Sequence, residues 1–272
     1  MIVITITNQK GGVAKTTTAS ALGFGLVNRG YRVLFIDTDA QCNLTDNVYP
    51  VNEQGEIIRE FKGNTINEVM LKECKIADAI YHTKYENADL VPASLFLTEI
   101  DMRLINSIGR ESILQKALKD IEEQYDYCII DTPPSLGWMT INALTASDYI
   151  IIPTFTEKFS IMGIKQLYDN YLTISNTVNP KLKLLGFLVT RNKAKSTVAR
   201  ETKEILEDIA REMGVSVFNA VIREQVAINE AQFTEVSIYD YLKKSNKRVR
   251  GNVADDYNSF VDEVLERIGE AK

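Results

Sequence analysis

The sequence predicts an α/β protein with a doubly wound, mainly parallel sheet flanked by helices. Short runs of β-branched and apolar residues alternate with helical stretches along most of the 272 residues. Several of these runs are apolar almost without interruption, which is typical of strands buried on both faces of a parallel sheet. We expect one domain, because the chain shows no internal repeat and no linker.

The first elements form a complete βαβ unit. Ile2–Ile6 is expected as a buried strand, the small-residue stretch from Thr16 to Asn28 as a helix, and Tyr31–Asp37 as a second strand. Further buried strands are expected at Asp89–Pro92, Tyr127–Asp131, Tyr149–Pro153, Leu184–Thr190 and Ser216–Ile222.

Two other segments have distinct patterns. Residues 51–64 are polar and predict a surface insertion, after which Thr65 and Glu68 have the spacing of a capping box for a helix running to about Lys72. The last helix, Val253–Ile268, combines an apolar face with an acidic polar face. Anionic lipid would repel that acidic face, so we expect the helix to pack on the sheet and not on a membrane.

Composition narrows the function classes. The net charge of −6 argues against a protein that coats nucleic acid over its whole surface, and the single histidine, His82, makes a Ser-His-Asp relay improbable. The three cysteines form no CxxC pair, and no apolar run is long enough for a signal peptide or a membrane span. These features favour a cytoplasmic protein.

A phosphate-binding loop is expected where the first strand meets the first helix. Asn8–Thr17 reads NQKGGVAKTT, in which successive N–H groups and the helix dipole favour an anion. Lys15 would reach the β and γ phosphates, and Thr16 would offer its hydroxyl to Mg²⁺. The standard GxxxxGK[ST] pattern fails, because Gln9 and Ala14 occupy its glycine positions.

The pattern KGGxxKTT resembles the deviant Walker A loop of the ParA/MinD family of P-loop ATPases. The resemblance implies ATP and Mg²⁺ as cofactors, and a homodimer in which Lys10 reaches the partner's nucleotide. It also implies that the family's usual glycine is replaced by Ala14, where a positive φ would cost about 1 kcal/mol. The implied nucleotide contacts are Lys10, Gly11, Gly12, Val13, Ala14, Lys15, Thr16 and Thr17.

The resemblance extends to the carboxylates. FIDTDAQCNLT (35–45) is similar to the family's switch I, and CIIDTPPSLG (128–137) to its Walker B strand and switch II. It implies that Asp39 orients the attacking water and that Thr16, Asp37 and Asp131 form the metal site. Lys10, Lys15, Asp39 and Asp131 are then the catalytic set. Alternatively, Asp37 and Asp39 are solvated turn residues.

Adenine is favoured over guanine. A guanine-specific NKxD run would need Asp at the position that Lys195 occupies after Asn192. In the family, the loop after this strand and a later segment, here 221–231, hold the base. We therefore expect base contacts near Ile222.

Local charge favours DNA binding without sequence preference. Residues 243–250 carry +5 while the remainder of the chain carries −11. Such a cluster suits phosphate-backbone contacts, although a solvated surface is the alternative for each residue. The expected DNA contacts are Lys193, Lys195, Arg200, Lys203, Lys243, Lys244, Lys247, Arg248 and Arg250. The first strand begins at once, so we expect no N-terminal helix-turn-helix.

The resemblance is to the small, Soj-like ParA proteins, which implies an ATPase for DNA partition. An ATP-dependent dimer would associate with the nucleoid, and a ParB-like centromere-binding protein would stimulate hydrolysis. The alternative is a nucleotide-dependent switch that positions a protein cargo or regulates a partner without DNA. A third possibility is hydrolysis made vestigial by Ala14.

Overall fold

The computed structural model describes residues 1–155, 158–192, 197–244 and 252–269, and among these it describes the backbone alone for 158–163, 197–200 and 202. The strands are Ile2–Ile6 (β1), Val33–Asp37 (β2), Tyr81–His82 (β3), Ala88–Val91 (β4), Tyr127–Asp131 (β5), Tyr149–Phe155 (β6), Lys183–Asn192 (β7) and Val217–Arg223 (β8). They form one sheet in the order β3-β4-β2-β5-β1-β6-β7-β8. Every neighbouring pair is parallel except β3 with β4.

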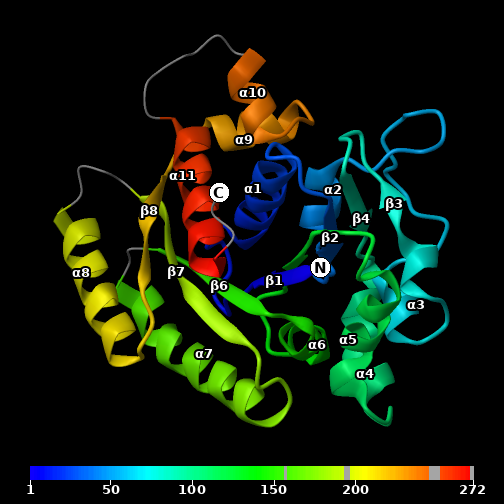
Figure 1. Ribbon diagram of the computed structural model, residues 1–272, viewed down its shortest axis with the longest axis horizontal. Coiled ribbons are helices and arrows are strands. Elements are labelled where there is room, and N and C mark those ends of the chain that lie inside the picture. The colour runs from blue at the N-terminus through cyan, green and yellow to red at the C-terminus, as the bar shows by residue number, and fades with distance from the viewer. Residues whose placement is uncertain (156–157, 193–196, 245–251, 270–272) are drawn as a thin grey trace.

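Helices cover both faces of the sheet (Figure 1). The α-helices are Lys15–Val27 (α1), Asn43–Val48 (α2), Ile66–Met70 (α3), Ile100–Leu104 (α4), Ile113–Leu118 (α5), Trp138–Ala146 (α6), Lys158–Thr177 (α7), Thr197–Glu212 (α8), Ala227–Phe233 (α9), Ile238–Lys244 (α10) and Val253–Ile268 (α11). Short 3-10 helices lie at Ile76–Ala79, Leu95–Glu99, Arg110–Ser112 and Lys119–Ile121. This architecture confirms the predicted doubly wound α/β fold.

The central strands are apolar on both sides because both sides are covered. In β1, Ile4 and Ile6 face the cluster beneath α1 and α11, whereas Val3 faces the cluster beneath α5 and α6. Figure 1 shows α11 beside α1 on one face of the sheet, with α7 and α8 on the other. The uninterrupted apolar runs of the sequence therefore have the expected cause.

The segment after β2 is organised as the sequence predicts. Helix α3 begins at a capping box, in which Thr65 N donates to Glu68 Oε2 at 2.7 Å and Asn67 N donates to Thr65 Oγ1 at 3.2 Å. Residues 53–56 of the predicted insertion are exposed, and Arg59 forms an ion pair with Glu235 in the turn before α10. That these residues are an insertion in a single domain stays a prediction.

Helix α11 packs against β8 and α1, which confirms that its apolar face covers the sheet. Its polar residues contact the backbone of the sheet edge. Glu263 accepts hydrogen bonds from the N–H groups of Asn219 and Ala220, each at 3.0 Å, and Arg267 donates to Leu185 O at 2.7 Å and Val217 O at 2.9 Å. The charged side of α11 thus belongs to the fold itself.

Candidate functional site

The phosphate-loop residues lie at the carboxyl edge of the sheet, between β1 and α1. Strand β1 lies between β5 and β6. The chain passes from β1 to β2 on the β5 side of the sheet, and after β5 it crosses to β6 on the other side of β1. In open parallel sheets a crevice forms at such a switch point, outside the carboxyl ends of the strands. The loop therefore occupies the position where a ligand site is expected.

The backbone of this loop is held in unusual angles. Gly12 has φ 73° and Ala14 has φ 63°, so the positive φ considered for Ala14 from the sequence is present. Asn8 shapes the start of the loop: its Oδ1 accepts from Lys10 N at 2.9 Å, and its Nδ2 donates to Pro153 O at 2.7 Å. The loop is consequently fixed against the end of β6.

Lys15 and Thr16, the first residues of α1, meet the end of β5. Thr16 Oγ1 donates to Asp131 Oδ2 at 2.6 Å, and Lys15 Nζ donates to Lys10 O at 3.3 Å. The other oxygen of the buried Asp131, Oδ1, has no hydrogen-bond partner among the described residues. An unpartnered buried carboxylate oxygen is costly, so its retention indicates a place for a cation or a donor from a ligand.

The end of β2 organises switch I. Asp37 lies beside Asp131 in register, and it is fully buried. Its Oδ1 accepts from Asp39 N at 3.0 Å, while its Oδ2 accepts from both the N–H and the hydroxyl of Thr45, each at 2.8 Å. The structure thus makes Asp37 the residue that holds the switch I loop, and its service as a metal ligand stays a prediction.

Burial dominates the ionisation of this cluster. It raises the pKa of Asp37 to about 6 and raises the pKa of Asp131, to which the charge of Asp37 adds. Burial also lowers the pKa of Lys15, although Asp131 and Asp39 oppose that change. A bound cation would favour the charged forms of Asp37 and Asp131, which burial disfavours.

A cleft of about 850 Å³ opens beside these residues. The lining residues are Gly11, Gly12, Ala14, Lys15, Thr16, Thr17, Asp39, Gln41, Asn43, Asp46, Asn47, Pro134, Arg191, Glu224, Gln225, Val226, Ile228, Asn229 and Gln232. Its size is within the usual range of small-molecule sites. The loop, switch I and the segment after β8 therefore share one cavity.

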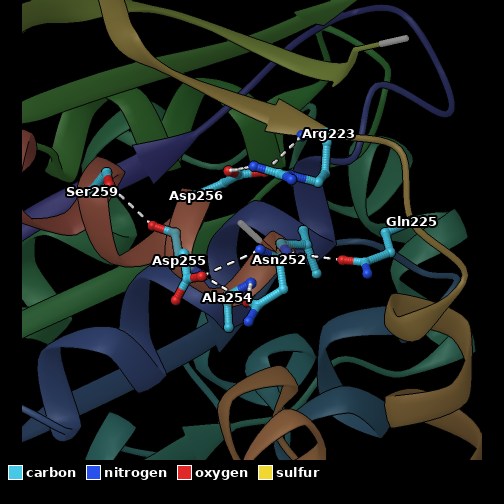
Figure 2. Close-up of polar contacts among 8 residues, drawn as sticks. Arg223, Gln225, Asn252, Ala254, Asp255, Asp256 and Ser259 are labelled. Carbon is cyan, nitrogen blue, oxygen red and sulfur yellow. Dashed lines mark hydrogen bonds and ion pairs between the residues drawn. The ribbon is translucent and has the colours of Figure 1, made fainter. Parts of the chain in front are cut away.

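The wall formed by the segment after β8 is fastened to the start of α11 (Figure 2). Gln225, a lining residue, accepts through Oε1 from Val253 N at 2.8 Å. Arg223 donates through Nε and Nη2 to Asp256, at 2.6 and 2.7 Å. Asn252 caps the helix by accepting from the N–H groups of Ala254 and Asp255. The position of this wall therefore depends on α11.

Three predicted nucleotide contacts lie outside the described lining of the cleft. The Lys10 ammonium is 5.5 Å from the ring centroid of Phe155, and Val13 is buried with its carbonyl accepting from Thr190 Oγ1. The Ile222 side chain is buried in the core beneath α11, and base contacts near it stay a prediction. Residues 224–229 of the same predicted segment contribute the lining instead.

The structure describes the side chains of three of the predicted DNA contacts. Lys243 and Lys244 are exposed in the last turn of α10, with Lys243 at 3.8 Å from Asp240, and Lys203 of α8 lies 3.6 Å from Glu207. The side chain of Arg200 and all of Lys193, Lys195, Lys247, Arg248 and Arg250 lie outside the described residues. The basic cluster therefore stays a prediction.

Sequence reasoning missed Arg191, which forms an ion pair at 2.9 Å on the cleft wall with Glu224, a residue inside the predicted base-holding segment. It also missed the carboxamides of switch I and α9 that line the cleft. The one signal in the sequence that could have indicated Arg191 as a site residue is its position directly before the Asn192–Lys195 run. Among the described residues, no group of three or more His, Cys, Asp or Glu side chains could by itself hold a metal ion. No described helix is both long and apolar enough to cross a bilayer.

Comparisons with known proteins show which family the chain resembles. A family model described as "AAA domain" matches residues 1–184. The chain is 35% identical over 229 residues to the sporulation initiation inhibitor protein Soj of Bacillus subtilis, covering 84% of this chain and 87% of that protein.

Two solved structures share the fold. One is the cobyrinic acid a,c-diamide synthase of Mycobacterium smegmatis with bound ATP analogue and magnesium, with TM-score 0.81, 29% identity, and coverage of 100% of this chain and 97% of that one. The other is a plasmid partition protein of Borrelia burgdorferi, with TM-score 0.73, 27% identity, and coverage of 98% and 99%. The loop, the strand-end carboxylates and these likenesses together make the chain a member of the ParA/MinD family of P-loop ATPases.

Proposed function

We propose that this chain is a ParA-like partition ATPase in which ATP joins two copies into a dimer that binds DNA. One observation carries the proposal: a single loop presents two lysines to different places. Lys15 lies in the cleft, whereas Lys10, five residues earlier, lies outside the described cleft lining beside Phe155. This separation of the two lysines supports the proposal that Lys10 serves the nucleotide of the partner subunit.

The residues fit ATP and Mg²⁺. The orphan oxygen of Asp131 and the hydroxyl of Thr16 are hard oxygen donors at the edge of the cleft, which is the donor type that Mg²⁺ prefers. Thr16 and Asp131 would hold the ion, with Asp131 acting through water. When bound, Mg²⁺ supplies charge neutralisation for the phosphate oxygens. The ATP-analogue and magnesium complex of a relative supports this assignment.

The remaining roles belong to the chain's own side chains. Lys15 adds positive charge beside the phosphates, and the N–H groups of residues 11–17 donate to their oxygens. Asp39 lines the cleft and orients the attacking water. Positioning and charge are the main requirements of phosphoryl transfer, so no histidine is needed.

We propose that the whole chain acts as one ATPase domain with 51–64 as a surface insertion, and that a ParB-like protein stimulates hydrolysis. The dimer would pair two basic clusters on an otherwise acidic body, so DNA binding would be reversible and strongly salt-dependent. In that state the protein would associate with the nucleoid.

Gel filtration and DNA retention at low salt, with ATP or with ADP, test the proposal. Wild type is expected to form a dimer and retain DNA with ATP alone. Lys15→Ala should do neither, and Asp39→Ala should accumulate the ATP-bound dimer. Neutralising Lys243, Lys244, Lys247, Arg248 and Arg250 together should remove DNA retention and leave ATP binding intact. A wild type that dimerises with ATP yet ignores DNA would favour the cargo-positioning switch.

A further inference from the structure

The end of β7 holds two successive carbonyl groups of the phosphate loop. Arg191 Nη1 donates to Gly12 O at 3.3 Å, and Thr190 Oγ1 donates to Val13 O at 3.1 Å. The Thr190 hydroxyl is shared, because it also lies 3.2 Å from Thr154 O. Arg191 Nη1 donates to the loop carbonyl of Gly12, whereas the one hydroxyl hydrogen of Thr190 is shared between a loop carbonyl and a carbonyl of β6.

These contacts fix the orientation of peptide units in the loop. In a planar trans peptide the carbonyl of one residue and the N–H of the next point in opposite directions. Holding Gly12 O towards Arg191 thus directs the N–H of Val13 away from it, and holding Val13 O does the same for the N–H of Ala14. The orientation of two potential phosphate donors is set from β7.

Arg191 is itself held under strain. Its φ is 49°, a left-handed angle that costs a residue with a side chain of order 1–2 kcal/mol. Three contacts maintain it: a two-nitrogen pair with Glu224 at 2.9 and 3.2 Å, the Gly12 carbonyl, and the Phe155 ring at 4.7 Å from its guanidinium carbon. Strained residues that surroundings hold in place are concentrated at ligand clamps.

A plain surface ion pair does not explain this arrangement. Arg191 and Glu224 have side-chain exposures of 49% and 39%, and exposed pairs contribute little to stability. The pair instead joins three parts of the cleft, since Arg191 is the last but one residue of β7, Glu224 begins the wall after β8, and Gly12 belongs to the loop. The planar guanidinium group of Arg191 can contact several groups at once, because it offers five N–H donors in a fixed fork.

We propose that Arg191 is a positioning residue that keeps the Gly12–Val13 peptide unit oriented for nucleotide phosphates, with Glu224 orienting Arg191. This inference rests on the proposed function, because it takes the cleft to be the nucleotide site. Its consequence is that Arg191 raises the affinity for every nucleotide whose phosphates the loop holds, without taking part in hydrolysis.

Direct titration with MgATP and MgADP tests the inference, in a Lys10→Ala background so that dimer formation does not enter the affinities. Arg191→Ala is expected to raise both dissociation constants by about tenfold and by equal factors, the order expected for losing a hydrogen bond from a charged donor. In steady-state hydrolysis with Lys10 intact, the loss should appear mainly as a raised KM for ATP, with a smaller effect on kcat, as expected for a residue that positions the binding loop and does not contact the reacting atoms. Added guanidinium ion at low millimolar concentration should restore part of the affinity.

Two further variants separate the causes. Arg191→Gly also lacks the guanidinium but removes the cost of the left-handed angle, so it keeps the test available should Arg191→Ala fold poorly. Both variants losing affinity equally supports the proposal, whereas Arg191→Gly with wild-type affinity would show that backbone strain alone is responsible and would overturn it. Glu224→Gln, which keeps the shape and loses the charge, should show a smaller loss in the same direction.

The failures of the two proposals are distinguishable. Unchanged affinities in Arg191→Ala overturn the positioning role whether or not the protein binds DNA. Absent DNA retention in wild type, with normal nucleotide affinity, counts against partition and leaves the result for Arg191 intact. A wild type that binds neither nucleotide refutes both.

Discussion

Thr16 Oγ1 lies 2.6 Å from Asp131 Oδ2, so one hydrogen bond joins the first turn of α1 to the end of β5. The bond occupies one carboxylate oxygen, and in the part of the chain that the structure describes the other, fully buried oxygen has no partner. A buried charge with half its hydrogen-bonding capacity unused costs stability and suits a site completed by a ligand.

Replacing Asp131 by Asn should therefore separate activity from stability. Burial raises the pKa of Asp131, which means that the folded state disfavours its charge at neutral pH. Asp131→Asn should raise the melting temperature by about 2–4 °C for each kcal/mol gained. ATP hydrolysis should fall by about 100-fold or more, as expected when a charge that organises the transition state is lost.

Scanning calorimetry and phosphate release measure the two effects of Asp131→Asn. Asp126→Asn is the matched control, because the hydrogen bond from Arg32 lowers the pKa of Asp126 at an exposed position. That control should lose a little stability and keep its activity. A lower melting temperature for Asp131→Asn would contradict the prediction.

The raised pKa of Asp37 should make the free energy of unfolding depend on pH. Burial raises its pKa from 3.8 to about 6, so protonated Asp37 stabilises the folded state relative to the charged form. This contribution to the free energy of unfolding is fully present below the unfolded pKa and is lost as the pH rises through 6. The free energy of unfolding of wild type relative to Asp37→Asn should therefore fall by up to about 3 kcal/mol between about pH 4 and about pH 7. Urea unfolding of both proteins across this range measures it; a difference that rises with pH would refute it.

Ala14→Gly should stabilise the loop. The φ of 63° is costly for alanine and free for glycine, so the variant should gain about 1 kcal/mol less the added flexibility of its unfolded chain. Thermal unfolding measures the gain, and phosphate release shows whether Ala14 slows turnover. Ala21→Gly, at a buried position within α1, is the control and should lose stability. Equal losses at both positions would count against strain at Ala14.

Asp256→Ala should weaken the attachment of α11 to the wall of the cleft. Asp256 accepts three hydrogen bonds from Arg223, two of them from its guanidinium, so the loss should be about 2–3 kcal/mol. Asp262→Ala on the same helix removes an exposed pair with Arg29 and should cost less than about 1 kcal/mol. Chemical denaturation compares the two, and similar losses would show that the Arg223 contact has no special weight.

The sequence predicted the strands with uniform environments well. β1 and β5 have the bounds expected for them, because residues buried on both faces leave an uninterrupted apolar run. β3 was missed, since Tyr81 and His82 form only a two-residue antiparallel strand that lacks any pattern. Its existence depends on pairing with β4, a contact that local sequence does not encode.

The same contrast holds for the site. Asp131 could be found because a carboxylate ending a buried strand must lie at the sheet edge beside the phosphate loop. The burial of the Ile222 side chain could not be predicted, because a strand apolar on both faces does not reveal which residues face the helices. Arg191 was missed because its partners, Gly12 and Glu224, meet it only when β7 lies next to the loop and to β8.

Strand β8 ends the sheet, yet side chains of α11 already occupy backbone groups that an added strand would seek. Glu263 takes the N–H groups of Asn219 and Ala220, Asp256 takes that of Arg223, and Arg267 takes the Val217 carbonyl. By bonding to these backbone groups, the side chains leave fewer of them free to pair with a strand of another molecule, which disfavours intermolecular β-sheet growth at this edge. The acidic residues of α11 thus also help to keep this edge of the sheet from pairing with strands of other molecules.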